Sequence, residues 1–185
     1  MRYKPEIILG FTLIELLVTI SIAAILLGVA IPSFITTIDS NRLATITNEF
    51  VTALNMARSE AIKRGMQVTV VRKGATSGEW QSGWDVFLDS DGNNAFNDDA
   101  DSTLCEAGED CLLRTYESLP SGYTLSTGNS TYEDYASYSP SGMSTVVVGD
   151  TFTLCSSSGS NKPRRTITIN ATGRPRINAT PGTCP

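Results

Sequence analysis

The sequence contains no histidine among its 185 residues. The most common general base of enzymes and the most common zinc ligand are therefore both missing. The four cysteines, Cys105, Cys111, Cys155 and Cys184, include no C-x-x-C pair, which excludes a thioredoxin-like redox motif and gives no zinc-site spacing. No serine or cysteine has a recognisable base partner. The sequence thus predicts neither an enzyme nor a metal or cofactor site.

Charges of one sign are missing from long stretches of the chain. Residues 74–150 carry 14 acidic side chains and a single basic one, whereas residues 151–185 carry five basic side chains and no acidic one. The formal net charge of −5 hides this segregation. An acidic chain opposes non-specific binding to nucleic acid, but it leaves a local role open for the basic tail.

Charged residues are also absent from Leu16 to Ile38, a run long enough to cross a hydrocarbon core of roughly 30 Å as a helix. The short polar stretch before it ends on Gly10. An ordinary secretory signal is cut after its apolar run, whereas a cut after Gly10 would leave the apolar helix on the mature chain. The basic residues Arg2 and Lys4 would stay cytoplasmic, and the rest would be exported.

Glu15 is a carboxylate close to the start of this apolar run. An acidic residue at the centre of a membrane helix costs on the order of 2.5–3.5 kcal/mol. Glu15 would lie about one turn from a new amino terminus at Phe11, so the amine and the carboxylate can pair, most usefully between neighbouring subunits. The alternative interpretation is an acid tolerated at the membrane interface.

The rest of the chain predicts one helix followed by strands. Apolar residues recur at helical spacing over residues 39–64, namely Leu43, Ile46, Phe50, Leu54, Ala57 and Ala61. After Gly65 the pattern favours strands over 66–72, 84–88 and 165–170, and shorter β-rich runs over 144–148 and 151–154. We therefore expect an α+β fold, in which a long N-terminal helix, with a membrane half and an amphipathic half, packs on antiparallel β-sheet.

The run Gly10-Phe11-Thr12-Leu13-Ile14-Glu15-Leu16 resembles the processing site of type IV pilins and type II secretion pseudopilins. The resemblance implies a prepilin leader over 1–10, a transmembrane and filament-core helix over 11–38, and a periplasmic head over 39–185, helical over 39–64 and β-rich over 65–185. It implies cleavage between Gly10 and Phe11 by a prepilin peptidase and N-methylation of Phe11. It also implies that Glu15 helps each subunit to dock into the filament.

Three internal stretches resemble the minor-pilin group GspH/FimT, also called FimT/FimU. They are A-R-S-E-A at 57–61, G-W-x-V-F-x-D at 83–89 and T-G-R-x-R at 172–176. The resemblance implies a pilin-like fold and a minor pilin of a type IV pilus that initiates or caps filament assembly. Its partners would be other minor and major pilins and the inner-membrane assembly platform. It would sit in the bacterial inner membrane as a single-pass protein and then in the pilus at the cell surface.

Two alternatives to this function stay open. One is a type II secretion pseudopilin of the GspH type, and the other is a purely structural minor pilin that binds no DNA. The predicted disulfides favour the pilus, because pseudopilins of this group more often lack them. An even number of cysteines in an exported domain predicts disulfides. We favour Cys105–Cys111 and Cys155–Cys184, because the second bond would hold the C-terminus, although sequence leaves other pairings open.

The basic tail predicts a contact with double-stranded DNA. Lys162, Arg164 and Arg165 lie at the start of a predicted strand, and Arg174 and Arg176 follow it. In an extended segment Arg174 and Arg176 point the same way, and two parallel guanidinium groups fit successive phosphates. In some FimT-type proteins a G-R-x-R motif at this position binds DNA during natural transformation. The alternative is that these arginines meet the chain's own acidic surface or a neighbouring minor pilin.

The segment from Asp89 to Asp101 has the composition of a calcium loop but not its pattern. An EF-hand requires glycine at loop position six and a bidentate glutamate at position twelve. Here the glycine falls at position four and Ala100 occupies position twelve. We predict an acidic loop exposed to solvent rather than a calcium site.

Overall fold

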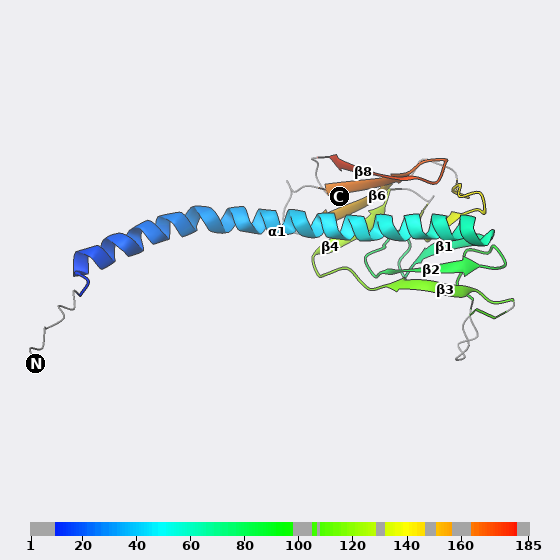
Figure 1. The fold of residues 1–185 in the computed structure, drawn as a ribbon, viewed down its shortest axis with the longest axis horizontal. Coiled ribbons are helices and arrows are strands. Elements are labelled where there is room, and N and C mark those ends of the chain that lie inside the picture. Colours follow the sequence, from blue (N-terminus) through cyan, green and yellow to red (C-terminus); the bar gives the residue numbers. More distant parts are fainter. Residues whose placement is uncertain are drawn as a thin grey trace, which may run out of the picture. The chain divides into compact units, whose positions relative to one another are not determined.

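The computed structural model describes residues 10–97, 105–106, 108–128, 132–146, 151–156 and 164–180 (Figure 1). The chain divides into two compact units, Met1–Ser40 and Asn41–Pro185, and each is considered by itself. Apart from Gly10, the predicted leader lies outside the described residues. One helix, α1 (Leu13–Arg64), supplies most of the described part of the first unit and continues into the second.

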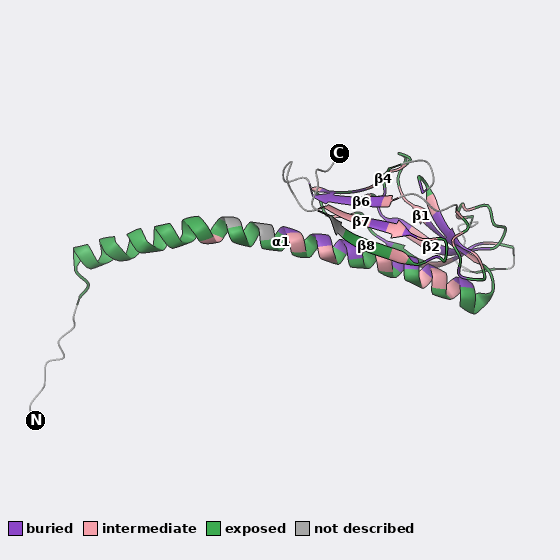
Figure 2. Cartoon of the chain, turned by 90° about the horizontal axis from the view of Figure 1, so that it is seen from above, coloured by how far each residue is buried: buried purple, intermediate pink, exposed green. Residues whose placement is uncertain are grey.

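Helix α1 begins with a capped and strongly apolar segment. The N–H of Glu15 donates to Oγ1 of Thr12 at 3.3 Å, so Thr12 is the N-cap and Glu15 has the spacing of a capping box. Large apolar side chains from Phe11 to Ile38 are exposed, and this half of the helix appears in the exposed colour in Figure 2. The helix is long and apolar enough to cross a membrane. Such a surface needs lipid or other apolar helices around it.

In the second unit the helix buries one face. All six apolar positions predicted from the helical spacing, Leu43 to Ala61, are buried, which confirms the amphipathic stripe. The helix ends at Arg64. Gly65 has φ +67° and donates its N–H to the carbonyl of Ala61 at 2.9 Å, so it terminates the helix as a left-handed C-cap.

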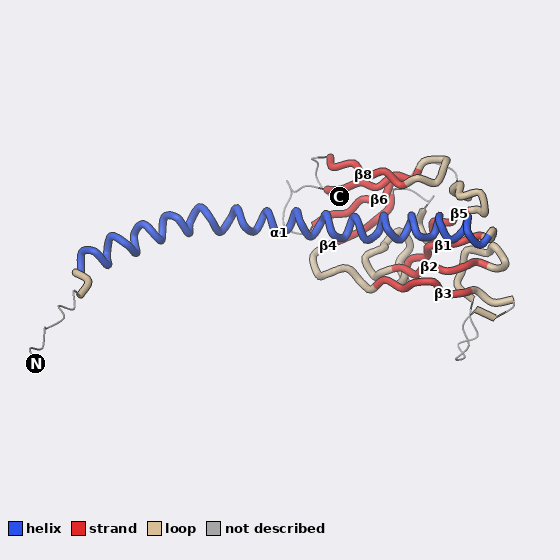
Figure 3. The backbone as a smooth tube through the Cα atoms, viewed as in Figure 1, coloured by secondary structure: helices blue, strands red, loops and turns tan. Residues whose placement is uncertain are grey.

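Eight strands follow within the described residues, and they form two antiparallel four-stranded sheets (Figure 3). The first sheet has the order β3-β2-β1-β5 and consists of β1 (Gln67–Arg72), β2 (Trp84–Asp89), β3 (Cys111–Tyr116) and β5 (Tyr135–Tyr138). The second has the order β4-β6-β7-β8 and consists of β4 (Tyr123–Thr127), β6 (Thr151–Ser156), β7 (Arg164–Ile169) and β8 (Pro175–Thr180). The predicted α+β class is confirmed.

The sequence pattern located β1, β2, β6 and β7 but was wrong about residues 144–146. Ser144 forms only an isolated bridge with Tyr138. A tight turn precedes it, in which Ser139 donates its N–H to the carbonyl of Met143 at 2.9 Å, and Thr145 then donates its N–H to the carbonyl of Ser137 at 3.0 Å. The chain thus lies against the end of β5 for two residues only and bends at residues 145–146, and the rest of that predicted run lies outside the described residues.

The core of the second unit centres on Phe50. Its ring makes edge contacts with Trp80, Trp84 and Phe152, at centroid separations of 5.6, 4.9 and 4.8 Å. These rings tie the helix to both sheets. Every member of the buried core cluster, from Leu43 to Ile169, lies within this unit. A soluble head that starts at residue 41 therefore retains its complete core.

Candidate functional site

The basic residues of the tail lie on the hairpin formed by β7 and the edge strand β8. The strands pair antiparallel, with Arg176 opposite Thr168 and Ile177 opposite Ile167. Ile167 is buried, so Thr168 and Arg176 project from the opposite, outer face. Arg164 has the parity of Thr168 and shares that face, about 13 Å further along β7.

Two of the predicted arginines do not lie on this outer face of the strands. Arg165 has the parity of the buried Ile167, so it begins on the inner side of the sheet. Arg174 lies in the turn just before β8. Lys162 lies outside the described residues. Arg174 and Arg176 are both exposed, and that they point the same way stays a prediction.

The turn that carries Arg174 is organised by Asn170, which the sequence analysis did not single out. Its Oδ1 accepts the N–H of Arg174 and the hydroxyl of Thr172, both at 2.8 Å. Its carbonyl accepts the N–H of Gly173, also at 2.8 Å. An asparagine three residues before a glycine between two strands is a turn signal that could have identified it.

Neither Arg174 nor Arg176 forms an ion pair within the described part of the chain. The ion pairs there are Lys63–Glu60, Arg64–Glu60, Arg72–Asp134 and Lys73–Asp85. The pKa of Asp134 is held below its usual value by a hydrogen bond from Ser77 and then by Arg72. Among described residues, the paired carboxylates thus bind other basic side chains, whereas Arg174 and Arg176 are exposed to solvent.

The predicted processing and assembly residues lie at the exposed end of the first unit. Gly10 and Phe11 precede the helix, and Phe11 is 79% exposed. Glu15 is exposed in the first helical turn. The Gly10–Phe11 bond therefore lies in non-helical backbone, the conformation that a peptidase needs in order to reach a peptide bond.

Most of the described residues of the acidic loop after β2 are exposed, as predicted, but two carboxylates at its borders are buried. Asp89 and Asp110 are each 2% exposed, and together with Asp91 they bring carboxylate oxygens within 4.8 Å of one another. The Oδ1 of Asp89 accepts the N–H of Gly92, and its Oδ2 accepts the N–H of Asn94. The two oxygens of Asp110 accept three further donors, from the N–H and hydroxyl of Ser90 and the N–H of Asn97. Protein donors thus already solvate the two buried carboxylates.

We expect calcium to leave the thermal stability of the head unchanged. A calcium site with an ordinary extracellular Kd of about 10⁻⁴ M would stabilise the fold by about 2.7 kcal/mol at 10 mM calcium. We expect no such gain, because protein donors already satisfy the carboxylates of Asp89 and Asp110, which an ion would have to take from them. The measurement is the melting temperature with 10 mM calcium against 10 mM magnesium and against chelator. A rise specific to calcium would contradict this expectation.

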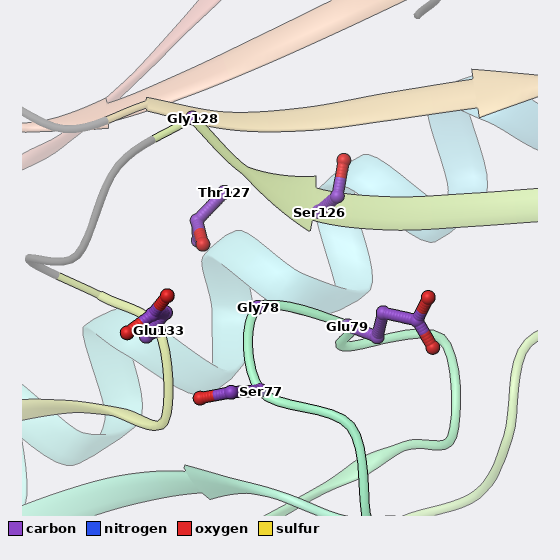
Figure 4. A pocket seen from close by; sticks show the side chains of 7 residues that line it. All are labelled: Ser77, Gly78, Glu79, Ser126, Thr127, Gly128 and Glu133. Carbon is purple, nitrogen blue, oxygen red and sulfur yellow. The ribbon is translucent and has the colours of Figure 1, made fainter.

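A polar pocket lies between the end of β4 and the loops before β2 and β5 (Figure 4). It has a volume of about 260 Å³ and is lined by Ser77, Gly78, Glu79, Ser126, Thr127, Gly128 and Glu133. Two backbone hydrogen bonds cross it, from Gly78 N–H to the Glu133 carbonyl and from Thr127 N–H to the Gly78 carbonyl. The hydroxyl of Ser77 in this lining donates to Oδ1 of Asp134 at 2.6 Å. The pKa of that carboxyl is held below its usual value, so it is a weak base and Ser77 is not an activated nucleophile.

Three described cysteines of the second unit are disulfide-bonded. Cys105 and Cys111 are joined, which is the local pairing that we favoured. Cys155 is also disulfide-bonded. Its predicted partner, Cys184, lies outside the described residues, so that pairing stays a prediction.

Two family models match the chain. One, described as type II transport protein GspH, matches residues 47–173. The other, described as the prokaryotic N-terminal methylation motif, matches residues 9–31. No curated protein sequence matches the chain.

Solved structures show the same fold. Two crystal forms of the type IV minor pilin FimU from Pseudomonas aeruginosa (strain PAO1) are similar to it. The form in space group P21 is 18% identical, with a TM-score of 0.52, over 77% of this chain and 91% of that one. The form in space group P65 is 16% identical, with a TM-score of 0.50, over 73% and 91%. At these identities the likeness concerns the fold alone.

Proposed function

Because the chain belongs to the GspH family, we propose that it is a minor pilin of a type IV pilus and that it initiates or caps filament assembly. The observation that carries this proposal is the methylation motif on the apolar, exposed half of a helix whose other half belongs to a folded head. Before assembly the apolar half would be held by the bacterial inner membrane, with the head in the periplasm. In the filament it would pack among the helices of other minor and major pilins.

The maturation steps follow from the same motif. A prepilin peptidase would cut the Gly10–Phe11 bond and methylate the new amino terminus at Phe11. The assembly platform of the inner membrane would then extract the subunit into the filament. The hydrogen bond from Glu15 N–H to Thr12 supports a helix that is already ordered close to the cut.

Substitution Glu15→Gln is expected to abolish entry into the filament while leaving processing intact. Glutamine keeps the size of the side chain but removes the charge, so the amino terminus of a neighbouring subunit would be left unpaired among apolar helices. Breaking a buried ion pair by removing one partner costs about 3–5 kcal/mol, which corresponds to a more than 100-fold loss of incorporation. The measurement is the amount of subunit in sheared pili, with mass spectrometry of the N-terminus to verify cleavage and methylation.

The matched control is Glu49→Gln, which removes an exposed carboxylate from the same helix within the head. We expect this variant to enter pili normally. Wild-type incorporation of the Glu15→Gln subunit would contradict the assembly role and favour an acid that is merely tolerated at the interface.

A second candidate is a pseudopilin of type II secretion, which the description of the matching family favours. Deletion separates the two functions. Loss of pili with normal protein secretion supports the pilus, and loss of secretion with normal pili supports the pseudopilin. Complementation with the wild-type chain verifies that either defect belongs to this protein.

A further role for the pilus subunit is capture of double-stranded DNA for natural transformation. The observation that favours it is the pair Arg174 and Arg176, which are exposed in the turn before the edge strand and in that strand, and which form no ion pair among described residues. Arg164, on the same outer face of the hairpin as Arg176, would extend the contact along the phosphates. If these arginines instead meet a neighbouring pilin, the subunit is purely structural.

A further inference from the structure

Two of the sequence motifs, at 57–61 and 172–176, meet in space through a turn at Gly142, which is 84 residues beyond Arg58 in the chain. Arg58, in the A-R-S-E-A motif, is half-buried on helix α1 and donates from Nε to the carbonyl of Gly142 at 2.8 Å. Gly142 belongs to the tight turn after β5, in which its own N–H donates to the carbonyl of Ser139 at 2.8 Å. The arginine therefore ties this turn to the end of the helix.

The turn of the T-G-R-x-R motif packs directly against the Gly142 carbonyl and the Arg58 side chain. A β-carbon at Gly173 would lie closer than 3.0 Å to the Gly142 carbonyl oxygen and 3.2 Å from Arg58 Nε. Gly173 also has φ +75°, a conformation that favours glycine. The glycine thus allows two backbone turns to approach each other. Figure 1 shows the β7–β8 turn and the loop after β5 near the same end of the helix.

Arg58 has no carboxylate partner among described residues that would account for its half-buried position. Its described hydrogen bond goes to the carbonyl on which Gly173 rests. A half-buried guanidinium loses hydration, and a single carbonyl replaces only part of it. The stabilisation that offsets this lost hydration must come from ordering the turn that packs on the Gly142 carbonyl. In that turn Arg174 follows Gly173.

We propose that Arg58 is a positioning residue for Arg174. Arg58 holds the Gly142 carbonyl in place, and Gly173 packs against this carbonyl. The position of Gly173 in turn sets the direction in which Arg174 presents its guanidinium group. The DNA part of this inference rests on the proposed contact between Arg174 and phosphate. The conformational part, that Arg58 orders the turn, does not.

The DNA test is a double-mutant cycle on the full chain in detergent micelles with fluorescent double-stranded DNA. Arg58→Met keeps the aliphatic stem but removes the charge and the donor. If Arg58 positions Arg174, this variant loses the phosphate contact of Arg174, and the salt slope falls by about 0.9. Adding Arg58→Met to Arg174→Ala then causes no further loss, because both changes remove one contact. Arg58→Lys, which keeps a charged donor, is expected to retain most of the affinity.

Additive losses in this cycle would overturn the proposal, because they would mean that Arg58 contacts DNA independently. Circular dichroism melts show whether each variant is folded. If Arg58→Met does not fold, Gly173→Ala replaces it. That change leaves Arg58 intact but pushes the turn away from the Gly142 carbonyl, and the same fall in salt slope is expected.

Amide hydrogen exchange by NMR tests the conformational part without DNA. The N–H groups of Gly173 and Arg174 both donate to Asn170. We expect Arg58→Met to speed their exchange while the Trp80 amide, which donates to Leu125 in the core, is unchanged. Unchanged exchange at Gly173 and Arg174 would overturn the proposal. Faster exchange in a protein whose wild type binds no DNA would support the positioning of the turn and refute the DNA contact.

Discussion

The double substitution Arg174→Ala/Arg176→Ala is expected to lower the affinity of the soluble head for double-stranded DNA by roughly 30-fold at about 0.15 M salt. Each arginine would neutralise one phosphate and release about 0.9 counterion, so the salt slope should fall by about 1.8. Both side chains are exposed, so the fold should be unaffected. The measurement is fluorescence anisotropy of labelled DNA with residues 41–185 over a series of salt concentrations.

The matched control removes two other exposed arginines, with Arg42→Ala/Arg114→Ala. Arg42 lies on α1 and Arg114 on β3, so this variant has the same net charge but an intact β7–β8 hairpin. We expect its salt slope to equal that of the wild type. An equal loss in both variants would indicate attraction by overall charge. Absence of binding by the wild-type head at low salt would leave a structural subunit whose arginines face protein.

Substitution Phe50→Ala is expected to destabilise the head by about 3–5 kcal/mol. Phe50 is fully buried, and its ring contacts Trp84 of β2, Phe152 of β6 and Trp80 in the loop before β2. Truncation would leave a cavity at the point where the helix meets the sheets. Because a typical domain is stable by only about 5–15 kcal/mol, the loss should lower the melting temperature by roughly 10 °C or more.

The control for this prediction is Asn55→Ala, on the exposed face of the same helix. Its free energy of unfolding should change by no more than about 0.5 kcal/mol. Denaturant unfolding with circular dichroism compares the two variants. A loss below about 1 kcal/mol in Phe50→Ala would mean that Trp80, Trp84 and Phe152 close the cavity without it.

The helix and the alternating strands were predictable because their signals are local. Burial of Leu43, Phe50 and Leu54 follows from a helical period, and β1 and β2 follow from alternation. The remaining strands, β3, β4, β5 and β8, were missed. β8 begins with a proline and is largely polar, and it becomes a strand because β7 offers it a partner.

The cluster of buried carboxylates beside the acidic loop could not be predicted from local sequence either. Composition predicted solvent exposure for residues 89–101, and most of the described ones are exposed, but Asp89 at the start is buried together with Asp110, which lies beyond that segment. The two residues are adjacent because β2 and β3 pair on either side of the loop. No spacing rule relates Asp89 to an aspartate that strand pairing brings beside it.

The sequence by itself determined the features that depend on neighbouring residues. These are the processing motif at Gly10 and Phe11, the apolar run of the helix, its amphipathic continuation and the presence of two arginines two positions apart. Only the tertiary structure decided that Arg176 lies on the outer face of its sheet and Arg165 on the inner face. It also decided that Arg58 binds the Gly142 carbonyl against which Gly173 packs. The reason is physical: periodicity follows from local backbone geometry, whereas strand register and close backbone approach require segments far apart in the chain to pack together.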